Sequence, residues 1–73
     1  LKGYSSSKYR LIRIALVLEL DLKETKELLA TDGKAFDYSI KDKVIISCIN
    51  NRIYDFNKVE DALKKIAKES LLD

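Results

Sequence analysis

Apolar residues recur at intervals of three and four along residues 9–30, and a polar break interrupts them near Asp21. This spacing is typical of amphipathic helices, because side chains at positions i, i+3 and i+4 lie on one helix face. The stretch predicts a first helix over residues 7–19 and a second helix that begins after Asp21. Asp21 can cap the second helix, since Glu24 follows at capping-box spacing. Gly33 can end that helix in the left-handed conformation.

The same pattern returns later in the chain. Residues 11–29 can be laid over residues 44–63 at an offset of 33, which becomes 34 after one inserted residue. Apolar positions then fall on apolar positions, and the break reads LDL in the first copy and YDF in the second. Such self-similarity indicates a repeated supersecondary unit, while helical period alone would produce part of the match. We expect two tandem helical hairpins, over residues 7–33 and 39–68.

The second copy predicts a third and a fourth helix. Ser39, with Asp42 at capping-box spacing, begins the third helix, and the pair Asn50-Asn51 ends it. The fourth helix begins at Asp55 or Asn57. Its expected inward-facing residues are Phe56, Val59, Leu63 and Ile66.

Length and composition agree with one small helical domain. The chain has 73 residues, of which 47% are hydrophobic and 36% charged, with no proline and two glycines. No apolar run reaches the roughly 18 residues of a membrane span, and no secretory signal is visible. We predict an all-α domain over residues 1–73, a four-helix bundle of the two hairpins, with Phe36 and Tyr38 filling the seam between them. We expect it to be an excerpt of a longer cytoplasmic protein.

Residue types of common catalytic and metal centres are scarce. The chain has no histidine, and its single cysteine, Cys48, cannot build a zinc site alone. We expect Cys48 to be a core residue of the third helix. The acidic residues meet lysines at helical spacing, and Asp21, Asp42 and Asp55 each have a place at a helix N-terminus. We therefore expect no enzyme, no metal, no cofactor and no small-molecule substrate.

The net charge of +2 is too small to indicate a nucleic-acid partner by itself. Basic residues gather, however, at the expected starts of the first and third helices, where helix amides, Lys and Arg can contact phosphates. These candidate phosphate-binding residues are Lys8, Arg10, Arg13, Lys41 and Lys43. In the alternative reading, buried helices turn their few polar residues to solvent. The third helix offers few side chains that read base edges.

The segments YRLIRIALVLELDLKETKELLATDG and DKVIISCINNRIYDFNKVEDAL resemble a helical segment of many bacterial regulators of the lambda-repressor-like, XRE-type helix-turn-helix class. The matching residues are Leu28, Leu29, Gly33, Phe36, Tyr38, Asp42, Val44, Ile45, Val59 and Leu63. In such regulators the DNA-reading helices usually precede this segment. The chain has no glutamine, which the XRE recognition unit typically carries. The resemblance therefore implies a module that accompanies a DNA-reading domain.

These observations favour a non-catalytic regulatory or protein-interaction module of a bacterial regulator-like protein. It would pack on a neighbouring domain or on a second copy of itself. The candidate partner contacts are Ile46, Leu71 and Leu72. The alternative is a DNA-binding domain that contacts phosphates through the basic starts of the first and third helices.

Overall fold

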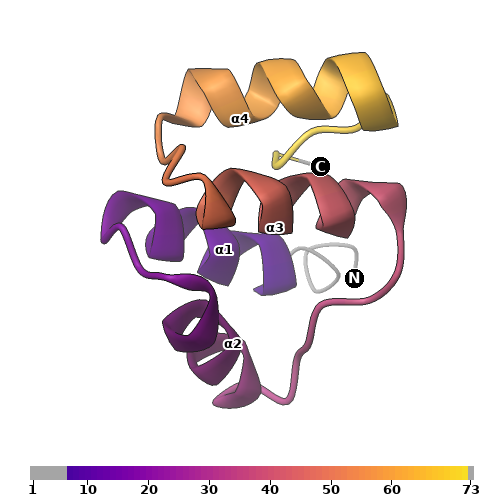
Figure 1. The fold of residues 1–73 in the computed structure, drawn as a ribbon. Coiled ribbons are helices and arrows are strands. Elements are labelled where there is room, and N and C mark those ends of the chain that lie inside the picture. Colours follow the sequence, from indigo (N-terminus) through magenta and orange to yellow (C-terminus); the bar gives the residue numbers. More distant parts are fainter. Residues whose placement is uncertain (1–6, 73) are drawn as a thin grey trace.

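A computed structural model of the chain describes residues 7–72. Their helices are α1 (Ser7–Val17), α2 (Leu22–Ala30), α3 (Ile40–Asn50) and α4 (Phe56–Ala62), and α4 continues as a π-helical turn, η2 (Leu63–Ala67). The described range contains no strand, so the prediction of an all-α fold is confirmed. α1 packs on α2, α3 packs on α4 and η2, and α2 touches α3 across the two hairpins (Figure 1).

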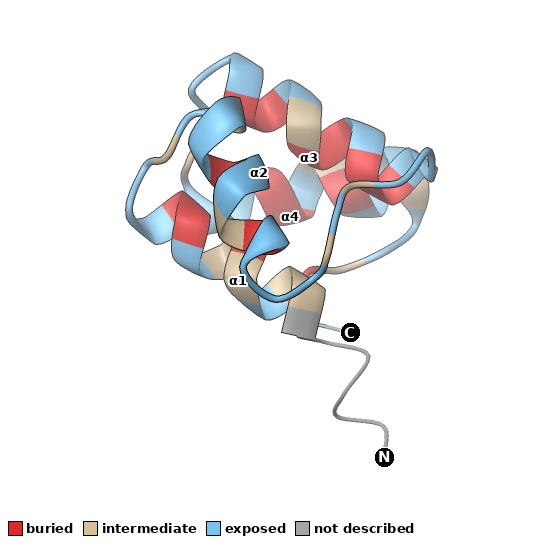
Figure 2. Ribbon diagram, turned by 90° about the horizontal axis from the view of Figure 1, so that it is seen from below, coloured by how far each residue is buried: buried red, intermediate tan, exposed pale blue. Residues whose placement is uncertain are grey.

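One apolar core lies where the two hairpins meet. In Figure 2 the buried positions, coloured red, turn toward one another at the centre of the bundle. The core residues are Ile12, Leu16, Leu29, Val44, Ile45, Cys48, Ile49, Val59, Leu63 and Leu71. Both hairpins contribute to this list, so each hairpin needs the other to cover its apolar side. Cys48 is the core residue that its position on the third helix predicted.

The two hairpin breaks share one backbone geometry. Glu19 and Arg52, which lie 33 positions apart in the chain, have positive φ angles of 55° and 58°. In each break the N–H of the following residue donates to the carbonyl five positions back, at Ala15 and at Cys48. This is the bond pattern of a Schellman helix end, here formed by residues that carry a Cβ. The repeat seen in the sequence at an offset of 33 is therefore also present in the backbone conformation of the two breaks.

Aspartates begin the second helix of each hairpin. Asp21 accepts from the Glu24 N–H at 2.8 Å, and Glu24 Oε1 accepts from the Asp21 N–H at 3.0 Å, so the predicted capping box is confirmed. Asp55 caps α4 by accepting from the N–H groups of Asn57 and Lys58. Since the two caps are 34 positions apart, the residue inserted in the second hairpin lies between Arg52 and Asp55.

Three expected core residues lie on the surface instead. Tyr38 is 92% exposed and does not fill the seam between the hairpins, where Phe36 packs half-buried against the core. Ile66 is 62% and Phe56 38% exposed. For Ile66 the cause is η2, in which the Lys68 N–H bonds the Leu63 carbonyl five residues back. This wider turn means that residue i+3 no longer returns to the face of residue i.

The segment after η2 folds back onto the bundle and corrects the prediction for Leu71. Leu71 is fully buried rather than an exposed partner contact. Its N–H donates to Glu60 Oε1 on α4 at 2.9 Å, and its carbonyl accepts from Arg13 Nη1 on α1 at 2.6 Å. The Ser70 hydroxyl donates to Glu60 Oε2 at 2.8 Å. A left-handed residue, Lys68 with φ 57°, turns the chain back after η2.

Leu71→Ala should lower the free energy of unfolding by about 2–5 kcal/mol, because truncating a buried leucine removes apolar contacts and leaves a cavity. The neighbouring Leu72 is 58% exposed, so Leu72→Ala should change that free energy by less than about 0.5 kcal/mol. Urea denaturation followed by far-UV circular dichroism measures both. Equal losses in the two variants would contradict the burial of Leu71.

Candidate interaction surfaces

A buried carboxylate joins the starts of α1 and α3. Asp42 is fully buried; its Oδ1 accepts from the Tyr9 hydroxyl at 2.7 Å. Its Oδ2 accepts from Lys8 Nζ at 2.5 Å and from the Asp37 N–H at 2.8 Å. Its own N–H donates to the hydroxyl of Ser39, the N-cap of α3. The expected Ser39 cap is thus present, whereas the Asp42 side chain faces α1 rather than its own helix end. We call these five residues the Asp42 cluster.

Two of the candidate phosphate-binding lysines have partners inside the protein. Lys8 is held by Asp42, and its side chain is only 13% exposed. Lys41 is 8% exposed, and its Nζ lies 3.7 Å from the centre of the Tyr9 ring, within the range of a cation–π contact. The lysines at both helix starts therefore stabilise the junction between the hairpins.

The Asp42 cluster also shifts the pKa values of two of its members, Tyr9 and Asp37. Burial, and then the hydrogen bond to Asp42, raises the pKa of Tyr9 well above its ordinary value. Hydrogen bonds from Ser39 hold the pKa of Asp37 well below its usual range. The ammonium of Lys8, 3.4 Å from Asp37 Oδ2, acts in the same direction. The cluster therefore favours a neutral Tyr9 and an ionised Asp37.

The three remaining basic candidates do not form one surface. Arg13 is half-buried and donates to the Leu71 carbonyl. Arg10 and Lys43 are exposed, but they line different hollows, one along α1 and the other along α3. The basic residues that stand close together at the helix starts in the sequence are thus divided between the interior and separate faces.

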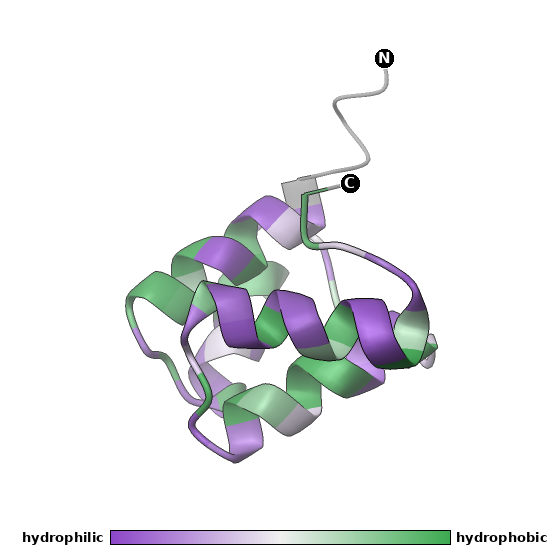
Figure 3. Ribbon diagram, turned by 90° about the horizontal axis from the view of Figure 1, so that it is seen from above, coloured by the Kyte–Doolittle hydropathy of each residue, from purple (hydrophilic) through white to green (hydrophobic). Residues whose placement is uncertain are grey.

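An apolar surface runs along the outer side of α1. Ile14, Val17 and Leu18 are 42%, 81% and 62% exposed, respectively. They line a shallow hollow of about 250 Å³ together with Arg10 and Arg13. Figure 3 shows hydrophobic colouring at the C-terminal end of α1, on the side of the molecule away from the chain ends. We call these five residues the α1 face.

A second apolar hollow, of about 430 Å³, lies between α3 and the end of the fourth helix. We call it the α3 groove, and its lining includes Ile40, Lys43, Val44, Ser47, Ile53 and Ile66. Ile40 and Ile66 are 58% and 62% exposed, respectively. The predicted contact Ile46 is half-buried and lines a different hollow, beside Phe36. Leu72 is exposed, as a partner contact would be.

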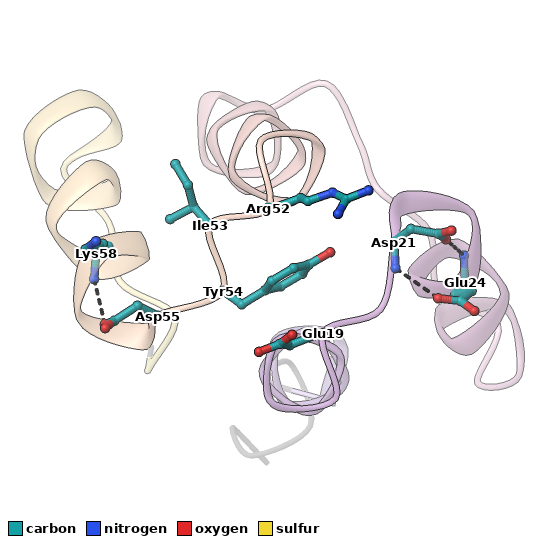
Figure 4. Close-up of a pocket in the computed structure, with 8 residues that line it drawn as sticks. All are labelled: Glu19, Asp21, Glu24, Arg52, Ile53, Tyr54, Asp55 and Lys58. Carbon is teal, nitrogen blue, oxygen red and sulfur yellow. Dashed lines mark hydrogen bonds between the residues drawn. The ribbon is translucent and has the colours of Figure 1, made fainter.

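The largest of these hollows, about 610 Å³, lies between the two hairpin breaks. In Figure 4 the ring of Tyr54 crosses it, and Arg52 points toward the same side as Tyr54, where Asp21 begins α2. Its carboxylates include Asp21, Glu24 and Asp55, which already accept hydrogen bonds in helix caps. One oxygen of each of these carboxylates is thus engaged in a helix cap.

Comparison of the chain with models of known protein families, with curated proteins and with solved structures gave no match. Among the described residues, no three His, Cys, Asp or Glu side chains are grouped as a metal site would require. No helix of the described range has the length and apolar character to cross a membrane.

Asp42→Ala should lower the free energy of unfolding by about 3 kcal/mol or more, because it leaves the Lys8 charge and the Asp37 N–H without their buried partner. Asp32→Ala is the control, since Asp32 is exposed and its removal should matter by less than about 0.5 kcal/mol. Chemical denaturation measures both. Similar stability of the two variants would show that the cluster contributes nothing to the junction.

Stability should also fall as the pH rises above the ordinary pKa of tyrosine, near 10. The pKa of Tyr9 is raised in the folded state, so its contribution is complete below pH 10 and is lost as the pH rises toward the folded-state pKa. Tyr9→Phe should make the unfolding free energy less dependent on alkaline pH. Tyr38→Phe should keep the wild-type dependence, because Tyr38 is 92% exposed. The same pH profile for both variants would contradict this assignment.

Proposed function

We propose that the chain is a non-catalytic protein-interaction module of a regulatory protein. The observation that carries the proposal is the placement of large aliphatic side chains outside a closed core. Isolated exposed aliphatics are ordinary, but groups that line a shared hollow indicate a contact surface. The α1 face and the α3 groove each gather at least two aliphatic side chains that are more than one third exposed.

The absence of catalysis in this proposal follows from the state of the reactive groups in the described range. The Cys48 thiol is buried, and burial raises its pKa, which disfavours the nucleophilic thiolate. The carboxylates of Asp21, Asp55 and Asp42 are engaged in helix caps or in the Asp42 cluster. These groups support structure, and the α1 face and the α3 groove are the apolar surfaces left for function.

The regulatory context of the proposal comes from the resemblance of residues 8–66 to segments that accompany XRE-type DNA-reading domains. Direct DNA binding by this chain has less support. Lys8 and Lys41 contact Asp42 and Tyr9, and Arg13 contacts Leu71. Arg10 and Lys43 remain as exposed cations of the predicted set, and they line separate hollows.

Photo-crosslinking in cells tests the proposal. A benzophenone amino acid at position 17, in the α1 face, or at position 66, in the α3 groove, should give a discrete adduct with another polypeptide or a second copy. The same amino acid in place of Lys23, which is exposed on α2, should give little adduct. No adduct from either surface, or equal adducts from all three positions, would contradict an interaction module.

DNA binding is checked separately with a mixed-sequence duplex at low salt, where phosphate contacts are strongest. We expect no mobility shift. A shift that weakens steeply as salt increases would replace the proposal with the DNA-binding alternative.

A further inference from the structure

We propose that the α1 face docks an acidic amphipathic helix of a partner protein. This inference rests on the proposed function and adds the surface and the chemistry of the partner.

Helix α1 is apolar on opposite sides. Its inner side places Ile12 and Leu16 in the core, where they are 0% and 3% exposed, respectively. Its outer side carries Ile14, Val17 and Leu18 in an i, i+3, i+4 arrangement. A helix at the surface of a domain ordinarily shows polar residues to solvent, and one that is apolar all round is typical of a helix covered on both sides. The outer side of α1 lacks such a cover among the described residues.

The α1 face carries positive charge. Arg10 and Arg13 are the charged residues that line the α1 face. Lys8, the other basic residue of α1, points into the Asp42 cluster. Arginine binds carboxylates in a bidentate manner more readily than lysine does, because its guanidinium is planar. A partner that carries Asp or Glu beside its apolar residues therefore complements this surface.

One of these two arginines is held in place by a hydrogen bond. Arg13 Nη1 donates to the Leu71 carbonyl at 2.6 Å. A guanidinium has five N–H donors, so this bond fixes the group at the edge of the face while other donors point elsewhere. The bond lowers the entropy that Arg13 loses when it binds a carboxylate. The Leu71 carbonyl thereby prepares the α1 face for an anionic partner.

The partner's helical form follows from the spacing of the aliphatic residues. Side chains at i, i+3 and i+4 form a ridge that fits the groove between the side chains of another helix.

A second copy of this chain fits the α1 face less well than a different partner. A symmetric contact centred on Ile14 would bring the two Arg13 side chains near each other. The α1 face also comprises five residues, few beside the roughly 20–30 that each partner of a stable complex contributes. We therefore expect a modest affinity.

Two synthetic helical peptides of about five turns test the proposal. One carries a leucine stripe flanked by Glu, and the other carries Lys in place of every Glu. Fluorescence anisotropy at low salt should show that the acidic peptide binds the whole chain at least about tenfold more tightly, a difference of about 1.4 kcal/mol. Equal affinity for both peptides, or no binding of either, would overturn the inference.

Substitutions on the chain locate the surface. Val17→Ser combined with Leu18→Ser should weaken binding of the acidic peptide at least about tenfold. Ile66→Ser is the matched control, because Ile66 and Leu18 are both 62% exposed, and it should leave binding unchanged. Loss of binding in Ile66→Ser alone would overturn the inference, while crosslinking from the α3 groove would still support the proposed function.

Charge reversal tests the partner's chemistry. Arg10→Glu should reduce the preference for the acidic peptide over the basic one, whereas Lys64→Glu, at an exposed position of η2, should not. Phosphatidylserine vesicles distinguish a lipid surface from a protein helix. If the wild-type chain binds these vesicles, loses that binding in the Val17→Ser, Leu18→Ser variant and ignores the acidic peptide, the face serves a membrane surface and the inference is overturned.

Discussion

The junction between the two hairpins depends on the buried carboxylate of Asp42. Removing a carboxylate from water costs several kcal/mol unless it is paired and hydrogen-bonded. Here the partners are Lys8 and Tyr9 of α1 and the N–H of Asp37 in the linker. Because these partners come from different segments, the charge is satisfied only when α1, the linker and α3 meet in this arrangement. Apolar burial alone would tolerate other dockings of two amphipathic hairpins, so the cluster selects one of them.

The same cluster withdraws two basic side chains from the surface. Lys8 and Lys41 lie at helix starts, where they would otherwise give two basic ends to the molecule, but both contact groups of the junction. On the outer side of α1 the arginines remain, beside aliphatic residues. Of the five predicted phosphate-binding residues, three are thus engaged within the fold: Lys8, Lys41 and Arg13. Besides the charged hollow between the hairpin breaks, the surface presents smaller apolar hollows along α1 and α3.

The sequence predicted the local features well and the long-range ones poorly. The Asp21 capping box, the Ser39 cap and the left-handed Gly33, with φ 67°, depend on neighbours within a few positions. The helical spacing of the apolar residues likewise predicted most core residues and revealed the repeat. In contrast, the partners of Asp42 lie as far as 34 positions away, and the contact of Leu71 with Arg13 spans 58 positions. No local pattern encodes such pairs. The outward turn of Ile66 was missed because α-helical spacing does not continue through a π-helical turn.

The two hairpins agree in their interiors and differ at their C-terminal ends. Thr25 and Val59 occupy equivalent buried positions, and the Thr25 hydroxyl is satisfied by the Asp21 carbonyl at 2.8 Å. The first hairpin ends at a glycine, whereas the second continues through η2 and returns a buried leucine to α1. That return places the Leu71 carbonyl against Arg13, at the edge of the α1 face. The returning segment of the second hairpin, which has no counterpart in the first, therefore holds an arginine of the first hairpin at the edge of the α1 face.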